Sequence, residues 1–268
     1  MRPLRELRAA DLASVRGLVF DLDDTVLTAG ELTLEAYRAL HQLRAAGFRL
    51  VACTGRPLGW GEVLVRQWPI DLAVTENGAV GVARDGAGLR RVDRLAPAER
   101  AARRERLHAL AGQILALAPD VALADDHWQR ASDVTIDVGE RRRLEPAEID
   151  RLRALAAARG VRTFLSSIHL HLTFDTDDKA SGTLHALESC WGEAPTDSLR
   201  RYAFVGDSSN DASCFAAFRL TFGVDNVRRH LATLSVAPRF VCPSARGAGF
   251  AELGRRLCLL RTGAEATA

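Results

Sequence analysis

The sequence predicts an α/β protein with a mainly parallel sheet, into which a smaller α+β module is inserted. Over residues 1–80, and again after Lys179, short apolar runs alternate with helical patterns. This alternation is typical of βαβ units and of the parallel sheet they build. Over roughly 79–173 the rhythm changes to strand-like segments that could pair directly, accompanied by two helices. The sequence therefore indicates one core that is interrupted by a separate module.

The first part of the core contains three predicted strands and two helices. Each strand candidate is a short apolar run that stops abruptly at polar residues, as buried parallel strands do. Gly47 supplies the stop signal of the first helix. In chain order we expect strand 18–20, helix 33–46, strand 48–52, helix 58–67 and strand 71–75.

The inserted module is predicted to begin with a hairpin around the turn 85–88. Two helices and four strand-like segments follow it, and the strands could form a small sheet of their own. We expect helices 98–117 and 146–159 and strands 121–124, 132–138, 161–165 and 168–174. The resulting domain boundaries are 1–80 and 175–268 for the discontinuous core and 81–174 for the insert.

The alternating pattern returns in the last part of the chain. There we expect helix 180–190, strand 202–205, helix 211–218, strand 220–223 and a short strand at 240–242 before a C-terminal helix. Residues 1–17 fit a short amphipathic helix better than a targeting peptide, because acidic residues interrupt their arginines.

Composition narrows the class of protein. The chain has 268 residues, of which 47% are hydrophobic and 26% charged, and its formal net charge is +2. A nucleic-acid-binding protein usually shows a concentrated basic stripe, which is not evident here. No apolar run reaches the length of a membrane span. The five dispersed cysteines form no metal-ligand spacing and read as reduced thiols, so we expect a cytoplasmic protein. As separate expectations, its partner is a small molecule and it is a monomer or homodimer.

Lysine usage singles out one position. Of the 36 basic residues only Lys179 is a lysine, and the others are arginines. Arginine presents a planar fork of fixed charge, whereas lysine is a compact point charge. A chain that uses arginine almost everywhere still places an ammonium at position 179, which favours a functional role for it.

Polar residues with complementary chemistry stand at the predicted strand ends. In a parallel sheet these ends meet at one edge, where ligands bind. The candidates are Asp21, Asp23, Thr54, Lys179, Asp207, Asn210 and Asp211. Clustered carboxylates suit Mg²⁺, and a carboxylate can attack phosphorus while a hydroxyl and an ammonium hold the phosphoryl oxygens. The inventory therefore points to phosphoryl transfer.

Four segments also resemble the motifs of the haloacid dehalogenase superfamily, and they occur in the family's order. Residues 19–25, VFDLDDT, resemble its first motif, DxDx[TV] after an apolar strand. Thr54 after the run 50–53 resembles the second motif, and Lys179 resembles the third. Residues 206–211, GDSSND, resemble the fourth motif, GDxxND. The resemblance covers roughly 14–80 and 175–262 and implies a Rossmann-like core.

The resemblance also implies roles. Asp21 matches the nucleophile and a metal ligand, and Asp23 matches the general acid and base, with its backbone carbonyl on the metal. Thr54, Gly55 and Lys179 match the phosphate contacts. Asp207 matches the second metal carboxylate, and Asn210 and Asp211 match residues that support the metal and the lysine. Mg²⁺ is the implied cofactor. An acid at position 23 favours phosphate esters, because the dehalogenases that name the superfamily lack one there.

The position of the insert suggests a subclass. It lies between the second and third motifs and follows residues 75–79, TENGA. Both features resemble the IIB subclass, with an inserted C2B cap, which includes Cof-type sugar phosphatases, sucrose-phosphate phosphatase and mannosyl-3-phosphoglycerate phosphatase. The implied activity is hydrolysis of a small sugar phosphate, with mannosyl-3-phosphoglycerate as one candidate. The alternatives are a phosphomutase, a non-catalytic sugar-phosphate sensor and, more remotely, a phospho-acceptor signalling domain.

Five further residues are candidates for substrate or hinge contacts, each with a structural alternative. These residues are Arg56, Asn77, Arg130, His169 and His171. The two histidines would share one face of a strand, either toward substrate or as the polar outer face of a sheet.

Two departures from the family pattern also stand out: Asp24 occupies a position where the family often has glycine, and the segment 175–178 is unusually acidic.

Overall fold

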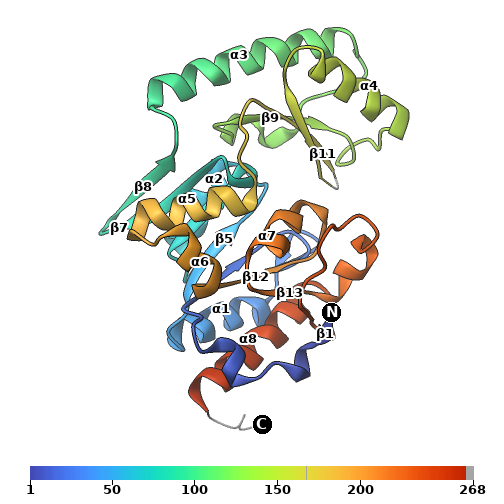
Figure 1. Ribbon diagram of the computed structural model, residues 1–268. Helices are drawn as coiled ribbons and strands as arrows, with labels where there is room; N and C mark the ends of the chain where they lie inside the picture. Colours follow the sequence, from blue (N-terminus) through green and yellow to red (C-terminus); the bar gives the residue numbers. More distant parts are fainter. Residues whose placement is uncertain (167, 264–268) are drawn as a thin grey trace.

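The computed structural model describes residues 1–166 and 168–263 and consists of a core and an inserted cap (Figure 1). The core is a nine-stranded sheet in the order β1-β14-β13-β12-β2-β5-β6-β7-β8, and a three-stranded sheet, β10-β11-β9, belongs to the cap. The strands are β1 (Arg2–Pro3), β2 (Gly17–Phe20), β3 (Leu27–Thr28), β4 (Glu31–Leu32), β5 (Arg49–Cys53), β6 (Leu72–Thr75), β7 (Val80–Asp85), β8 (Gly88–Asp93), β9 (Asp133–Asp137), β10 (Arg162–Leu165), β11 (His169–Thr173), β12 (Tyr202–Gly206), β13 (Leu220–Gly223) and β14 (Phe240–Val241).

Helices cover the sheets, and all of them except α6 lie close to their predicted positions. The helices are α1 (Leu34–Ala45), α2 (Leu58–Gln67), α3 (Pro97–Ala116), α4 (Pro146–Ala157), α5 (Lys179–Trp191), α6 (Pro195–Arg201), α7 (Ala212–Ala217) and α8 (Arg246–Thr262). In Figure 1, α3 and α4 lie at the top with the cap sheet, and the remaining helices surround the core sheet. No helix among the described residues is both long and apolar enough to cross a membrane.

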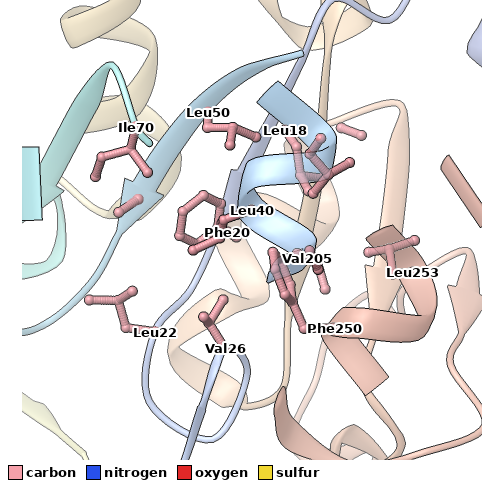
Figure 2. Packing of buried hydrophobic residues seen from close by; sticks show 14 of the residues in the cluster. Leu18, Phe20, Leu22, Val26, Leu40, Leu50, Ile70, Val205, Phe250 and Leu253 are labelled. Atoms are coloured by element: carbon pink, nitrogen blue, oxygen red, sulfur yellow. The ribbon is translucent and has the colours of Figure 1, made fainter. Parts of the chain in front are cut away.

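The central strands are apolar on both sides because helices pack on both faces of the sheet. Along β2, Leu18 and Phe20 belong to the cluster that α1, α2 and α8 cover, whereas Val19 belongs to the cluster beneath α5 and α7. Figure 2 shows the first cluster, in which the rings of Phe20 and Phe250 lie 5.6 Å apart. Burial on both faces holds the central strands rigidly, so the residues at their ends are placed accurately.

Three sequence expectations require correction. The hairpin that was assigned to the inserted module is β7–β8, which extends the core sheet in antiparallel fashion instead. Residues 1–17 form a two-residue strand and two 3₁₀ turns rather than an amphipathic helix. The segment 121–124 contributes only an isolated bridge from Leu123 to Ile136. We propose that the cap itself begins after β8 and ends before α5.

Candidate active site

The catalytic candidates follow three neighbouring strands at the centre of the core sheet. Strand β2 lies between β12 and β5 and is parallel to both. Asp21 follows β2, Thr54 follows β5, Asp207 follows β12, and Lys179 begins α5. Because all three strands run in the same direction, their carboxyl ends share one edge, as the sequence analysis expected.

The ammonium of Lys179 is bound by two carboxylates. Lys179 Nζ lies 2.6 Å from Asp21 Oδ1 and 2.7 Å from Asp211 Oδ1. Lys179 is only 1% exposed, and Asp21 and Asp211 are 4% and 0% exposed. A buried ion needs both a counter-charge and hydrogen bonds, and this arrangement supplies both. The lone lysine of the sequence is therefore the centre of a buried ionic cluster.

The electrostatics of the cluster are unbalanced. Burial raises the pKa of Asp21 well above its usual value; the charge of Lys179 offsets part of this effect, and repulsion from Asp211 and Asp207 adds to it. Burial, together with repulsion from Asp211, raises the pKa of Asp207 to about 7. Burial opposes the charge of Lys179, but Asp21 and Asp211 still raise its pKa well above the usual value. Three carboxylates around one ammonium therefore carry excess negative charge.

This excess fits a divalent cation. Asp21, Asp207 and Asp211 each offer an oxygen, and these three oxygens lie within 4.8 Å of one another. Carboxylate oxygens are the protein ligands that Mg²⁺ prefers, and two positive charges would balance the cluster. Among the described residues no hydrogen-bond donor contacts Asp21 Oδ2, so this oxygen remains open to a ligand. The donor set and the charge both suit Mg²⁺.

Both carboxylate oxygens of Asp211 already accept hydrogen bonds from the protein. Its Oδ2 accepts hydrogen bonds from the backbone N–H groups of Asp207 and Ser208, at 2.9 and 3.2 Å, while its Oδ1 accepts from Lys179. Gly206 makes room for this carboxylate, since a Cβ there would overlap Asp211 Oδ2. Asp211 therefore orients the lysine and the turn after β12, which leaves Asp21 and Asp207 as the better metal ligands.

Asn226 is a supporting residue that the sequence analysis missed. Its Nδ2 donates to Asp207 Oδ2 at 2.7 Å and to the backbone oxygen of Asp24 at 3.0 Å. Thr25 Oγ1 lies 3.3 Å from the other oxygen of Asp207. Asn226 stands three residues after β13. Polar residues just after parallel strands are candidates for a site. Asn226 follows β13, so the same criterion applied to β13 identifies it.

Asp23 lies outside the buried cluster. Its side chain is 52% exposed, and both of its oxygens accept hydrogen bonds from Arg56, the shortest at 2.6 Å. The guanidinium of Arg56 also stacks on the ring of Trp60, 3.7 Å from its centroid. Arg56 therefore contacts the residue that matches the general acid and base.

The conformation of Asp24 accounts for the glycine that often stands at this position. Its φ is 56°, in the left-handed region that glycine adopts without strain and that aspartate tolerates better than most residues. Its carboxylate forms an ion pair with Arg246 at 2.9 Å. The turn is thus the same one that a glycine would make, with an ion pair added.

The phosphate-contact candidates at the end of β5 lie against the turn that follows β6. Thr54 is fully buried, and its Oγ1 accepts a hydrogen bond from the Arg56 backbone N–H at 3.1 Å. The backbone oxygen of Thr54 accepts from Asn77 N–H at 3.1 Å, and the Asn77 side chain lies against Gly55. Asn77 has a φ of 55°, so its contacts shape the turn itself.

Glu76, in the same turn, connects the core to the cap. Its buried carboxylate accepts four hydrogen bonds from cap residues 131–133, of 2.6 to 3.2 Å, and one from the backbone of Leu58. Burial, with repulsion from Asp133, raises the pKa of Glu76. Beside it, Arg130 Nη1 donates to the backbone oxygen of Gly55 at 3.1 Å. Glu76 lies in the segment 75–79, TENGA, but the sequence alone carries no sign of this role.

His169 and His171 share one face of β11, as their spacing predicted, and both are buried in polar contacts. His171 Nδ1 lies 2.7 Å from Asp133 Oδ2, and His169 Nε2 lies 3.1 Å from Glu140 Oε2. Arg130 also pairs with Asp133, at 3.0 Å. These contacts join Arg130 and His171 in one network of the cap.

The acidic segment before Lys179 holds the linkers between cap and core. Asp175 pairs with the buried Arg100, which also pairs with Asp93 at the end of β8. Asp177 pairs with Arg94 on the other linker, and the Asp178 side chain caps α5.

In the fourth motif, Asn210 is exposed, and its Oδ1 accepts a hydrogen bond from Ser208 rather than contacting the cluster.

Comparison with known proteins agrees with this geometry. Residues 18–88 match the family model of haloacid dehalogenase-like hydrolases. A search of curated proteins gave no match. Among solved structures, a Thermoplasma acidophilum protein superposes with a TM-score of 0.70 at 16% identity, covering 92% of this chain and 99% of that one.

Two further structures share the fold. A HAD/COF-like hydrolase from Plasmodium vivax has a TM-score of 0.65 at 17% identity and covers 93% of this chain and 97% of its own. The sucrose-phosphatase of Synechocystis, solved with sucrose and phosphate, has a TM-score of 0.60 at 19% identity, with coverage of 89% and 96%. The family match covers residues 18–88, and these solved structures, at 16–19% identity, show that the chain as a whole shares their fold.

Proposed function

We propose that the protein is a Mg²⁺-dependent phosphatase that hydrolyses a small phosphomonoester through an aspartyl-phosphate on Asp21. The observation that carries this proposal is the buried cluster of Lys179, Asp21, Asp211 and Asp207, in which one oxygen of Asp21 stays open. Such a cluster is costly to maintain for stability alone, because its carboxylates repel one another. It is well suited to receive a cation and a phosphate.

Asp21 and Asp207 would hold the metal, with the backbone carbonyl of Asp23 as a third ligand. Bound Mg²⁺ would supply the positive charge that offsets repulsion between an anionic nucleophile and an anionic phosphate. Lys179 and Thr54 would hold phosphate oxygens, together with the backbone at Gly55. Lys179 is already positioned by Asp211, which keeps its ammonium beside the nucleophile.

The reaction has two steps. Asp21 Oδ2 forms a bond to phosphorus while the bond between phosphorus and the leaving oxygen breaks, and Asp23 donates a proton to that oxygen. Asp23 then accepts a proton from water as the water oxygen attacks phosphorus and the bond between phosphorus and Asp21 Oδ2 breaks. This releases phosphate and restores Asp21. Because Arg56 binds both oxygens of Asp23, Asp23 must exchange this partner to handle the proton.

A sugar phosphate is the substrate class that we favour. The Synechocystis relative is a sucrose-phosphatase, and another structure of the same fold is described as a trehalose-6-phosphate phosphatase related protein. The core would hold only the phosphate, so the cap would select the leaving group. Mannosyl-3-phosphoglycerate stays one candidate.

We also propose a reducing compartment such as the cytoplasm, because the described cysteines are all free thiols.

Phosphate release from a panel of phosphorylated sugars, sugar acids and nucleotides tests this function. Release that requires Mg²⁺ and stops on chelation would support it, and the preferred members would rank the leaving groups. If a sugar phosphate is instead isomerised with little free phosphate, the enzyme is a phosphomutase. If substrates bind without any turnover, the protein is a sensor.

A further inference from the structure

A basic hollow lies at the amino ends of the central strands, opposite the candidate active site. It has a volume of about 470 Å³ and is lined by Arg16, Arg200, Arg201, Arg219, Arg261 and Asp197. Arg16 directly precedes β2, and Arg201 directly precedes β12. Asp21 and Asp207 follow the same two strands, so the strands separate the hollow from the cluster by about 17 Å and about 20 Å, at roughly 3.3 Å per residue.

The hollow concentrates positive charge. Five guanidiniums face one carboxylate, whereas the whole chain has a formal net charge of only +2. Asp197 pairs with Arg200 at 2.7 Å and with Arg201 at 3.4 Å. Within 1–166 and 168–263, Arg16, Arg219 and Arg261 form no ion pair. Three guanidiniums are therefore left without an anionic partner.

The backbone around these arginines is fixed by hydrogen bonds between three segments. The N–H of Arg16 donates to Arg201 O at 2.6 Å, and the N–H of Arg219 donates to Leu199 O at 2.9 Å. Arg261 Nη2 donates to Val15 O at 2.7 Å, and its guanidinium lies over the Phe48 ring. A ligand would meet preformed walls, which reduces the entropy lost on binding.

The lining indicates the class of ligand. Guanidinium forks match phosphate oxygens in geometry and charge, and several of them together favour more than one phosphate group. The volume lies in the range of small-molecule sites. No aromatic side chain lines the hollow, so a nucleobase would find no stacking surface. We propose that this hollow, formed by Arg16, Arg200, Arg201, Arg219 and Arg261, binds a small polyanion through two or more phosphate groups.

Inorganic tripolyphosphate is a suitable probe, because it carries phosphates and nothing else. We would titrate it into the metal-free full-length protein by calorimetry at low salt. The wild type should bind one molecule per chain. The double variant Arg16→Gln/Arg219→Gln should bind at least about tenfold more weakly, since each lost charged hydrogen bond is worth about a factor of ten. Both side chains are exposed and form no ion pair, so the variant should unfold at the wild-type temperature.

The matched control is Arg38→Gln/Arg143→Gln, which removes the same charge from exposed positions on α1 and in the cap. It should bind tripolyphosphate like the wild type. Equal affinity in all three proteins would place the anion elsewhere, such as the phosphate site beside Lys179, and would overturn the proposal. So would an equal loss in the control, which would show charge attraction alone. Binding of a long oligonucleotide without tripolyphosphate binding would also overturn it, in favour of a nucleic-acid surface.

Discussion

At the scale of single residues, the cluster depends on side chains that hold other side chains in place. Asp207 is held by Asn226 and Thr25, and Lys179 is held by Asp211. Such supporting contacts fix the orientation of a metal ligand before the ion arrives. The same reasoning explains why a chain so rich in arginine keeps one lysine: a compact ammonium fits between two buried carboxylates.

Replacing Asn226 by alanine should weaken Mg²⁺ binding. The change removes the 2.7 Å hydrogen bond to Asp207 and leaves that carboxylate with the longer, 3.3 Å hydrogen bond from Thr25. Loss of such a support typically lowers metal affinity about 10- to 100-fold. The Mg²⁺ concentration that gives half-maximal phosphate release measures this effect. Asn210→Ala is the matched control, because Asn210 is exposed and, among the described residues, its side chain forms a hydrogen bond only with Ser208. An equal shift in both variants would show that Asn226 has no special role.

At the scale of elements, one close contact positions the lysine. The first turns of α5 pack directly on the turn after β6, because neither Gly182 nor Gly78 has a Cβ. A Cβ on Gly182 would overlap backbone atoms of Gly78, and one on Gly78 would overlap Asp178 O. This contact fixes the start of α5, and therefore Lys179, relative to β2.

Gly182→Ala should therefore be strongly destabilising, although alanine is the better helix former. We expect a loss of more than about 3 kcal/mol, as in overpacked cores, because backbone must move. Gly112 in α3 is a matched control, since a Cβ there meets nothing within 4 Å. Gly112→Ala should raise stability by about 0.5–1 kcal/mol. Urea unfolding of both variants measures the difference, and a neutral Gly182→Ala would contradict the contact.

Within the cap sheet, the pair of His171 and Asp133 should make stability depend on pH. Burial lowers the pKa of His171, while Asp133 only partly offsets this. Although burial opposes its charge, Asp133 has a pKa of about 2 because of Arg130 and His171. A histidine whose pKa is lowered on folding binds fewer protons in the native state than in the unfolded state. Stability should therefore fall as pH decreases below about 6.5.

The contribution of His171 can be isolated by substitution. His171→Asn keeps a donor for Asp133 but cannot gain a proton, so this variant should lose less stability than the wild type between pH 7 and pH 5. Thermal unfolding at several pH values gives the comparison. His230→Asn, at a partly exposed position, should follow the wild type. If His171→Asn also follows the wild type, another group carries the pH dependence.

Some parts of the fold carry a clear local pattern in the sequence, and others do not. Central strands such as β2 and β5 are apolar on both faces, so they were recognised. The β7–β8 hairpin was misassigned because an antiparallel edge strand carries no local sign of which sheet it joins. Glu76 was missed as a cap contact because its partners lie 55 to 57 residues away in the chain. Local patterns predict elements well, and contacts between distant segments poorly.

At the scale of the whole molecule, cap and core are joined by more than their two linkers. Arg100 holds both linkers through Asp93 and Asp175. Glu76 forms a third connection, to residues 131–133, next to the candidate phosphate site. These contacts hold the cap against the core in the arrangement that the structure shows.

Glu76→Gln should loosen this arrangement. Every partner of the carboxylate is a donor, so the amide NH₂ of glutamine would face N–H groups. We expect a loss of about 1–3 kcal/mol in unfolding free energy, the cost of buried donors left unsatisfied. Urea unfolding measures this loss, and Glu62→Gln on the exposed side of α2 is the control. Equal stability of the two variants would show that Glu76 does not hold the cap.

The central claim is that Asp21 carries the phosphoryl group, and rapid-quench peptide mapping tests it most directly. Wild-type protein is mixed with Mg²⁺ and the best substrate of the panel, quenched in acid within a turnover, digested and weighed by mass spectrometry. The account predicts one phosphoryl group on the peptide that contains Asp21, no such group with chelator, and neither modification nor turnover in Asp21→Asn. Full turnover by Asp21→Asn, or a phosphoryl group on another residue, would contradict it.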